Sequence, residues 1–100
     1  MHKNPIAAIA TPSGAGGVGI IRISGSSLRD LAAQLLGKAP RLRFAHYFVL
    51  RDSDNNQIDQ TLLIYFQSPA SFTGEDVIEI HCHGGPRITQ AVLKRVLEIG

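Results

Sequence analysis

Residues 14–25 read GAGGVGIIRISG, and this stretch decides between two kinds of fold. Its glycines match the G-x-G-x-x-G spacing of a dinucleotide-binding loop, which requires a helix to begin at the third glycine. Residues 18–24 are instead rich in β-branched side chains, which are typical of a strand. Ile20 and Ile21 also stand where a nucleotide-binding P-loop requires Lys and Ser or Thr. We therefore predict a glycine-rich connection between two strands, with no site for a nucleotide phosphate.

The segments on either side of this stretch predict one further strand and a helix. Residues 6–10 form a short apolar run that ends at a Pro- and Gly-containing loop, which indicates a buried strand. Residues 28–36 carry leucine and alanine at helical spacing, and Gly37 is suited to end that helix. Ser27 is the candidate N-cap, because Asp30 follows three residues later in a pattern similar to a capping box.

The second half of the chain predicts three strands and a final helix. Residues 44–50 and 58–66 are expected to pair as an antiparallel hairpin, 77–82 to form the fifth strand, and Pro86 to begin a helix that reaches residue 99. In the strand 58–66 we expect one mostly apolar face to point toward the core: Ile58, Gln60, Leu62, Ile64 and Phe66. The order ββαβββα predicts an α+β fold, with the helices packed on one face of a mainly antiparallel or mixed five-stranded sheet.

Length and composition restrict the class of protein. One hundred residues fit a single domain, 1–100, and no apolar run approaches the roughly 20 residues that cross a bilayer. The first residues lack a secretory signal, so we expect a cytoplasmic protein with no membrane partner. Cys82 is the sole cysteine of the sequence, which agrees with a reducing compartment.

The charges are unevenly distributed along the chain. Residues 1–50 contain six basic residues and one acidic residue, whereas residues 51–100 contain four basic and seven acidic residues. The basic cluster is Lys38, Arg41 and Arg43, beside Phe44 and Tyr47. We interpret this cluster as a solvated loop after a helix, with direct RNA binding as the alternative.

Two charged residues interrupt strands that are otherwise apolar. Arg22 lies within residues 18–24 and Glu79 within residues 77–82. Each side chain either points to solvent or lines a cleft, where the pair would hold a polar ligand.

The remaining polar residues support neither a metal site nor a nucleophile. His81 and His83 share one face of a strand, but a structural zinc site needs four ligands and the chain has no second cysteine. Cys82 falls on the apolar face of the same strand, and the chain has no Gly-x-Ser-x-Gly motif. We therefore expect no metal and no catalytic residue.

Several motifs together resemble one known family. They are the tripeptide Ala-Thr-Pro at 10–12, GGVGIIRISG at 16–25, SFTGED at 71–76, Glu79, and HGGP at 83–86. These motifs resemble the N-terminal domain of the tRNA-modification GTPase MnmE, also called TrmE, over essentially the whole chain. The resemblance implies a folate-binding-type subdomain, similar to half of the tetrahydrofolate-binding unit of aminomethyltransferases.

The resemblance also implies a ligand and partners. Arg22 and Glu79 fall on the family's folate-contacting arginine and glutamate, with formyl-tetrahydrofolate as the ligand and a homodimer that binds it near the interface. The full-length family acts with the flavoprotein MnmG on the wobble uridine of tRNA and hydrolyses GTP. The family's GTPase domain, with its GTP, magnesium and potassium, and a further folate-contacting lysine would lie beyond Gly100, so we expect this chain not to be catalytic on its own.

Two alternatives to this folate-binding module stay open. The first is a stand-alone one-carbon enzyme similar to an aminomethyltransferase. The second is an interaction domain that does not bind folate.

Overall fold

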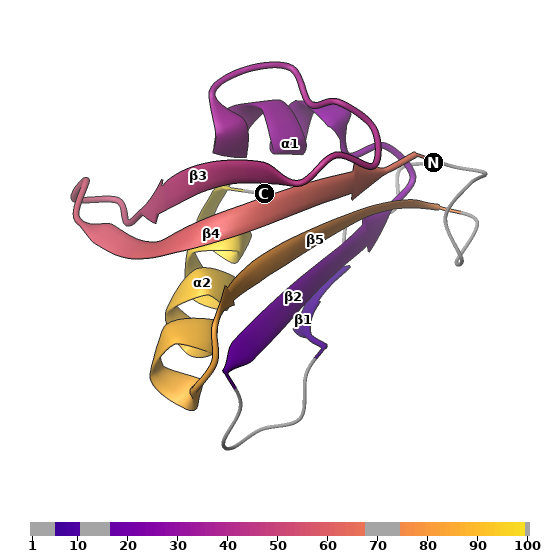
Figure 1. The fold of residues 1–100 in the computed structure, drawn as a ribbon. Helices are drawn as coiled ribbons and strands as arrows, with labels where there is room; N and C mark the ends of the chain where they lie inside the picture. Colours follow the sequence, from indigo (N-terminus) through magenta and orange to yellow (C-terminus); the bar gives the residue numbers. More distant parts are fainter. Residues whose placement is uncertain (1–5, 11–16, 68–74, 100) are drawn as a thin grey trace.

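The computed structural model describes residues 6–10, 17–67 and 75–99, which form five strands and two helices (Figure 1). The strands are β1 (Ile6–Ile9), β2 (Val18–Gly25), β3 (His46–Arg51), β4 (Gln57–Phe66) and β5 (Asp76–His83), and the helices are α1 (Arg29–Leu36) and α2 (Pro86–Ile99). The predicted order ββαβββα is confirmed. Because β2 runs without interruption from Val18, the predicted strand is confirmed at the position where a dinucleotide-binding loop requires a helix to begin. Most of that loop, residues 11–16, lies outside the described residues.

The strands form one antiparallel sheet in the order β1-β2-β5-β4-β3. The last strand in the chain, β5, therefore lies in the centre, between β2 and β4. In this register Glu79 of β5 lies directly opposite Arg22 of β2 on one side and Ile64 of β4 on the other. The predicted α+β class is confirmed.

Both helices cover the same face of the sheet and enclose the core. Helix α2 contacts β1, β2, β4 and β5 and passes behind β4 in Figure 1, whereas α1 contacts β3 and β4. The core consists of fully buried apolar side chains from the central strands and both helices, among them Ile21, Ile78, Ile80, Leu63, Leu28, Ala32 and Val92. The opposite face of the sheet has no helix of the described residues against it.

The predicted orientation of β4 is wrong. The buried face is Asp59, Thr61, Leu63 and Tyr65, whereas Gln60 and Leu62 are exposed. Both faces of this strand carry apolar residues, so hydropathy alone does not choose between them. The polar groups of the buried face have partners, since the Thr61 hydroxyl donates to the carbonyl of Phe48 at 3.0 Å.

The start of α1 also differs from the prediction. Leu28, and not Ser27, occupies the N-cap position, and no side chain caps the helix there. The Leu28 backbone N–H donates instead to a carboxylate oxygen of Asp76 at 3.1 Å, and the hydroxyl of buried Tyr65 donates to the same oxygen at 2.8 Å. Burial and the bond to Asp76 raise the pKa of Tyr65 to about 12. Asp76 thus ties the start of α1 to β4 and β5.

Gly19 allows α2 to approach β2 closely. A Cβ at this position would lie 2.5 Å from Cγ2 of Thr89 and 3.3 Å from both Sγ of Cys82 and the carbonyl oxygen of His83. The Thr89 methyl cannot easily turn away, because its hydroxyl donates to the Gly85 carbonyl at 3.0 Å. The glycine in the middle of this strand is therefore explained by packing.

Neither helix of the described residues is long and apolar enough to span a bilayer.

Candidate functional site

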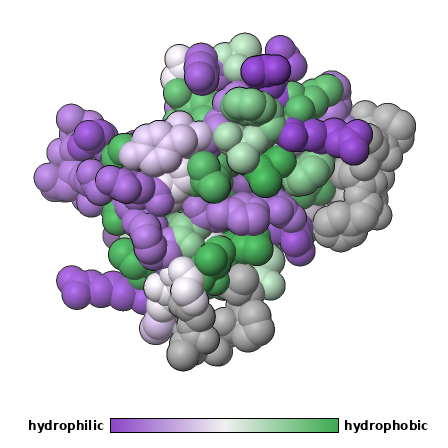
Figure 2. All heavy atoms as spheres, viewed as in Figure 1, coloured by the Kyte–Doolittle hydropathy of each residue, from purple (hydrophilic) through white to green (hydrophobic). Residues whose placement is uncertain are grey.

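The candidate site lies on the face of the sheet that the helices leave open. Figure 2 views the molecule from this side and shows hydrophobic side chains that reach the surface between hydrophilic ones. Large apolar side chains are exposed here, including Val18 (57% exposed), Tyr47 (63%) and Leu62 (40%). Exposed apolar groups that gather on one face are typical of a surface that binds a ligand or a partner.

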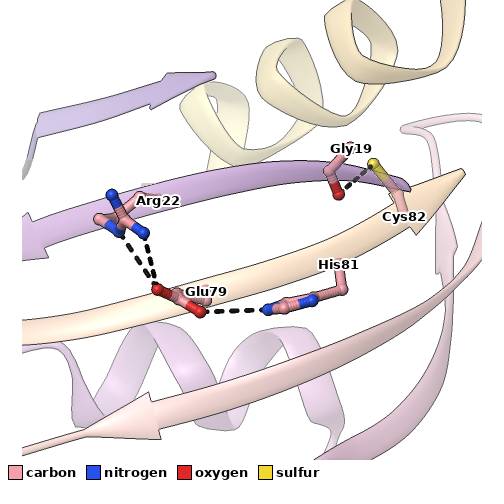
Figure 3. A network of polar contacts seen from close by, with 5 residues as sticks. All are labelled: Gly19, Arg22, Glu79, His81 and Cys82. Atoms are coloured by element: carbon pink, nitrogen blue, oxygen red, sulfur yellow. Dashed lines mark hydrogen bonds and ion pairs between the residues drawn. The ribbon is translucent and has the colours of Figure 1, made fainter. Parts of the chain in front are cut away.

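Arg22 and Glu79 meet on this face as a cross-strand ion pair (Figure 3). Nη2 of Arg22 lies 2.9 Å and Nε 3.3 Å from the same oxygen, Oε2 of Glu79. The side chains are 35% and 17% exposed, so the carboxylate is largely shielded from water and does not point freely into solvent. The structure brings together the two residues that the sequence singled out.

His81 holds the second oxygen of the same carboxylate. Its Nε2 lies 3.1 Å from Oε1 of Glu79, two residues earlier on the same face of β5 (Figure 3). Burial by itself would raise the pKa of Glu79, but the hydrogen bonds and charges of Arg22 and His81 outweigh it and hold this pKa below its usual value. Glu79 is therefore an ionised acceptor fixed between two donors.

A second polar pair lies further along β5. Nδ1 of His83 is 2.7 Å from Oδ1 of Asp59, and the His83 backbone N–H donates to Oδ2 of the same carboxylate at 2.8 Å. The Asp59 side chain is only 11% exposed, whereas His83 is 69% exposed. Because Nδ1 donates to the carboxylate, Nε2 of His83 is left as the acceptor that faces outward.

A shallow hollow of about 430 Å³ lies next to His81 and His83, but neither Arg22 nor Glu79 lines it. Its lining includes the apolar or aromatic residues Val18, Tyr47 and Leu62, and the polar residues Gln60 of β4 and His81 and His83 of β5. An apolar lining with a few fixed polar groups is typical of a site for a small molecule.

Cys82 points to the other side of β5, into the core. Its Sγ lies 3.6 Å from the Gly19 carbonyl, and burial together with the charge of Asp59 raises its pKa to about 11. The prediction that Cys82 occupies the apolar face is confirmed. Such a thiol is a poor nucleophile.

Among the described residues no group of three or more His, Cys, Asp and Glu side chains is placed to hold a metal ion. His81 and His83 each have a carboxylate partner instead, Glu79 and Asp59. Sequence reasoning weighed these histidines only as metal ligands and passed over Asp59. The available signal was an acidic residue within a predicted strand, because a carboxylate on the buried side of a strand needs a partner.

The chain is similar in sequence to one family of known proteins. A family model described as "GTP-binding protein TrmE N-terminus" matches residues 5–100. The chain is 52% identical over 99 residues to a tRNA modification GTPase MnmE of Nitrosomonas eutropha, and 50% and 48% identical over 98 residues to those of Erwinia tasmaniensis and Hamiltonella defensa. These alignments cover 98–99% of this chain but 21–22% of the relatives, so the chain spans about a fifth of their length. Over the length that it spans, the chain belongs to the TrmE N-terminal family.

Proposed function

We propose that this chain is the formyl-tetrahydrofolate-binding and homodimerisation module of a GTPase that modifies the wobble uridine of tRNA. The observation that carries the proposal is the Arg22–Glu79 pair on the open face of the sheet. His81, which binds Glu79, also lines the neighbouring hollow. The names of the relatives support the assignment to tRNA modification.

The donors and acceptors of the site fit a reduced pterin. A pterin edge presents an amino group and a ring N–H side by side, and an ionised carboxylate is the acceptor that suits both. Glu79 would hold this edge, and Arg22 keeps Glu79 ionised. Since Oε1 and Oε2 already accept from His81 and Arg22, the ligand would use the remaining lone pairs or compete with His81. When bound, the folate would supply a one-carbon group.

Calorimetry with formyl-tetrahydrofolate tests the folate site. One charge-assisted hydrogen bond contributes about 1.5–3 kcal/mol, so Glu79→Gln should weaken binding about tenfold or more. Arg22→Lys keeps the charge but loses the planar fork and should weaken binding as well. Glu98→Gln is the matched control, because Glu98 is an exposed carboxylate on α2, away from the open face. A well-folded parent chain that gives no binding heat would refute the folate assignment.

Homodimerisation is proposed to bury the open face of the sheet. Val18, Tyr47 and Leu62 would contribute the apolar part of the interface, and the ligand would then lie close to it. Sedimentation velocity at high micromolar concentration should show a dimer. Leu62→Lys should shift it toward monomer, whereas Leu97→Lys, at a similarly exposed leucine on α2, should not. If both variants remain dimeric, a different surface pairs the chains.

The Asp59–His83 pair favours a second candidate, a stand-alone one-carbon enzyme. A histidine whose Nδ1 donates to a buried carboxylate has the arrangement of a general base. Incubation of the chain with a large excess of formyl-tetrahydrofolate and an amine acceptor distinguishes the two functions. A binding module leaves the formyl group in place. An enzyme transfers it over many turnovers, to water as formate or to the amine as a formamide, with tetrahydrofolate as the other product, and His83→Gln would abolish that turnover.

The wider setting of the module is also a proposal. In the full-length protein it would act in the cytoplasm with the flavoprotein MnmG and tRNA, while the GTPase domain would bind GTP, magnesium and potassium. If the chain dimerises without binding folate, the alternative of a pure interaction domain replaces the folate-binding module.

A further inference from the structure

Residues 37–45 connect α1 to β3 (Figure 1). They carry basic side chains that the proposed folate site does not use, and we call these residues the basic loop. Lys38, Arg41 and Arg43 are all exposed, and none of the ion pairs among the described residues involves them. Within this loop six consecutive residues, 38–43, therefore present three cations, which span at most about 20 Å of chain.

Two backbone hydrogen bonds tie the basic loop to β3 and β4. The Arg43 N–H donates to the carbonyl of Tyr65 at 2.8 Å, and the Arg41 N–H donates to the ring nitrogen Nε2 of buried His46 at 2.9 Å. Arg43 has a φ of 57°, in the left-handed region that a side chain such as arginine rarely adopts. The cations are thus presented from a fixed scaffold, so little backbone entropy would be lost on binding.

An aromatic ring lies among these cations. The guanidinium of Arg41 stands over the ring of Phe44, 4.5 Å from its centroid, and the ring packs edge-on against His46 at 4.8 Å. Phe44 is nevertheless 44% exposed. A planar base could stack on the outer side of the guanidinium or on the exposed part of the ring.

We infer that the basic loop binds single-stranded RNA, with Lys38, Arg41 and Arg43 at the phosphates and Phe44 and Arg41 at a base. Cations interleaved with an exposed aromatic ring are typical of single-strand binding, whereas a folded acidic protein or a lipid headgroup has no base to stack. The choice of RNA among nucleic acids rests on the proposed function.

Fluorescence anisotropy with a labelled 12-nucleotide oligouridylate tests this surface in the absence of folate. Three phosphate contacts predict a slope of log affinity against log salt of about −2, or about 20-fold weaker binding at 200 mM than at 50 mM salt. Arg41→Gln with Arg43→Gln should reduce the slope to about −0.7. The control pair Arg87→Gln with Lys94→Gln removes the same charge from exposed positions on α2 and should leave the slope unchanged.

The stacking part is tested separately. Phe44→Leu keeps an apolar side chain but no ring, so it should weaken binding about fivefold or more at an unchanged salt slope. Circular dichroism checks that each variant remains folded.

Three results would overturn the inference: no binding of the parent chain at 50 mM salt, equal loss in both double variants, or polyglutamate competing as well as oligouridylate. Equal affinity for the matching DNA supports the surface and overturns its assignment to RNA. Since folate binding is measured without RNA, failure of the folate site leaves this result intact.

Discussion

Replacing Gly19 by alanine should destabilise the fold although the substitution is small. The added methyl would lie 2.5 Å from Cγ2 of Thr89, well inside an ordinary carbon–carbon contact. Thr89 is 6% exposed, and its hydroxyl is bonded to the carbonyl of Gly85, so its methyl cannot rotate away without loss of that bond. Either α2 moves away from β2 or the threonine gives up its hydrogen bond.

The size of the effect follows from two opposing contributions. Overpacking by one methyl group in a tight contact costs about 1–3 kcal/mol, while alanine restricts the unfolded chain and returns about 0.4–1 kcal/mol. The net loss in the free energy of unfolding should therefore lie between about 0 and 2.6 kcal/mol, with about 1.3 kcal/mol at the centre of the range. For a domain of this size the central value corresponds to a fall in Tm of about 5–10 °C.

A double-mutant cycle with Thr89→Ser isolates the contact. Serine keeps the hydroxyl but lacks Cγ2, so Gly19→Ala should be better tolerated in that background, with a coupling energy of at least about 0.5 kcal/mol. Urea denaturation of the parent chain, both single variants and the double variant gives the four values. An equal effect of Gly19→Ala in both backgrounds would show that the approach of α2 to β2 is not what requires glycine.

Three further predictions concern buried or partly buried groups. Asp76→Ala should lower the free energy of unfolding by about 2–4 kcal/mol, because it leaves the Leu28 N–H and the Tyr65 hydroxyl without their acceptor. Urea denaturation measures this loss. A loss below about 1 kcal/mol would contradict the role of Asp76 in tying the start of α1 to β4 and β5. Cys82, with its pKa raised to about 11, should react with iodoacetamide at pH 8 about 100-fold or more slowly in the folded chain than in urea, and rapid labelling of the folded chain would contradict its burial. The pKa of Glu79 is lowered from its ordinary 4.5, so the ionised carboxylate should stabilise the fold above that pH. This stabilisation should be lost as the pH falls through the lowered pKa. The difference in unfolding free energy between the parent chain and Glu79→Gln should therefore shrink between about pH 6 and 3.

The sequence predicted the elements well because each has a strong local signal. The β-branched run at residues 18–24 and the leucine spacing in 28–36 depend only on near neighbours, and both elements form where they were expected. Arg22 and Glu79 could be singled out from the sequence, because a charged residue within an apolar strand must either reach solvent or have a partner.

The predictions that failed depend on contacts between distant residues. The buried face of β4 is set by partners elsewhere in the chain, since Asp59 meets His83 and Tyr65 meets Asp76. The start of α1 is likewise satisfied by Asp76, 48 residues away from Leu28. No pattern within a short window contains such pairs. Hydropathy alone therefore predicted the wrong face of β4, and the local spacing of Ser27 and Asp30 predicted the wrong cap.

The central position of β5 has a consequence for the order in which the protein folds. The two hairpins, β1–β2 and β3–β4, precede it in the chain, yet they do not pair with each other. Until residues 76–83 have emerged from the ribosome, β2 and β4 each expose an unpaired edge, which is the kind of edge that pairs wrongly with other chains. Glu79, His81 and His83 belong to β5, the strand that completes the sheet. The candidate ligand site therefore cannot form before β5 has paired with β2 and β4.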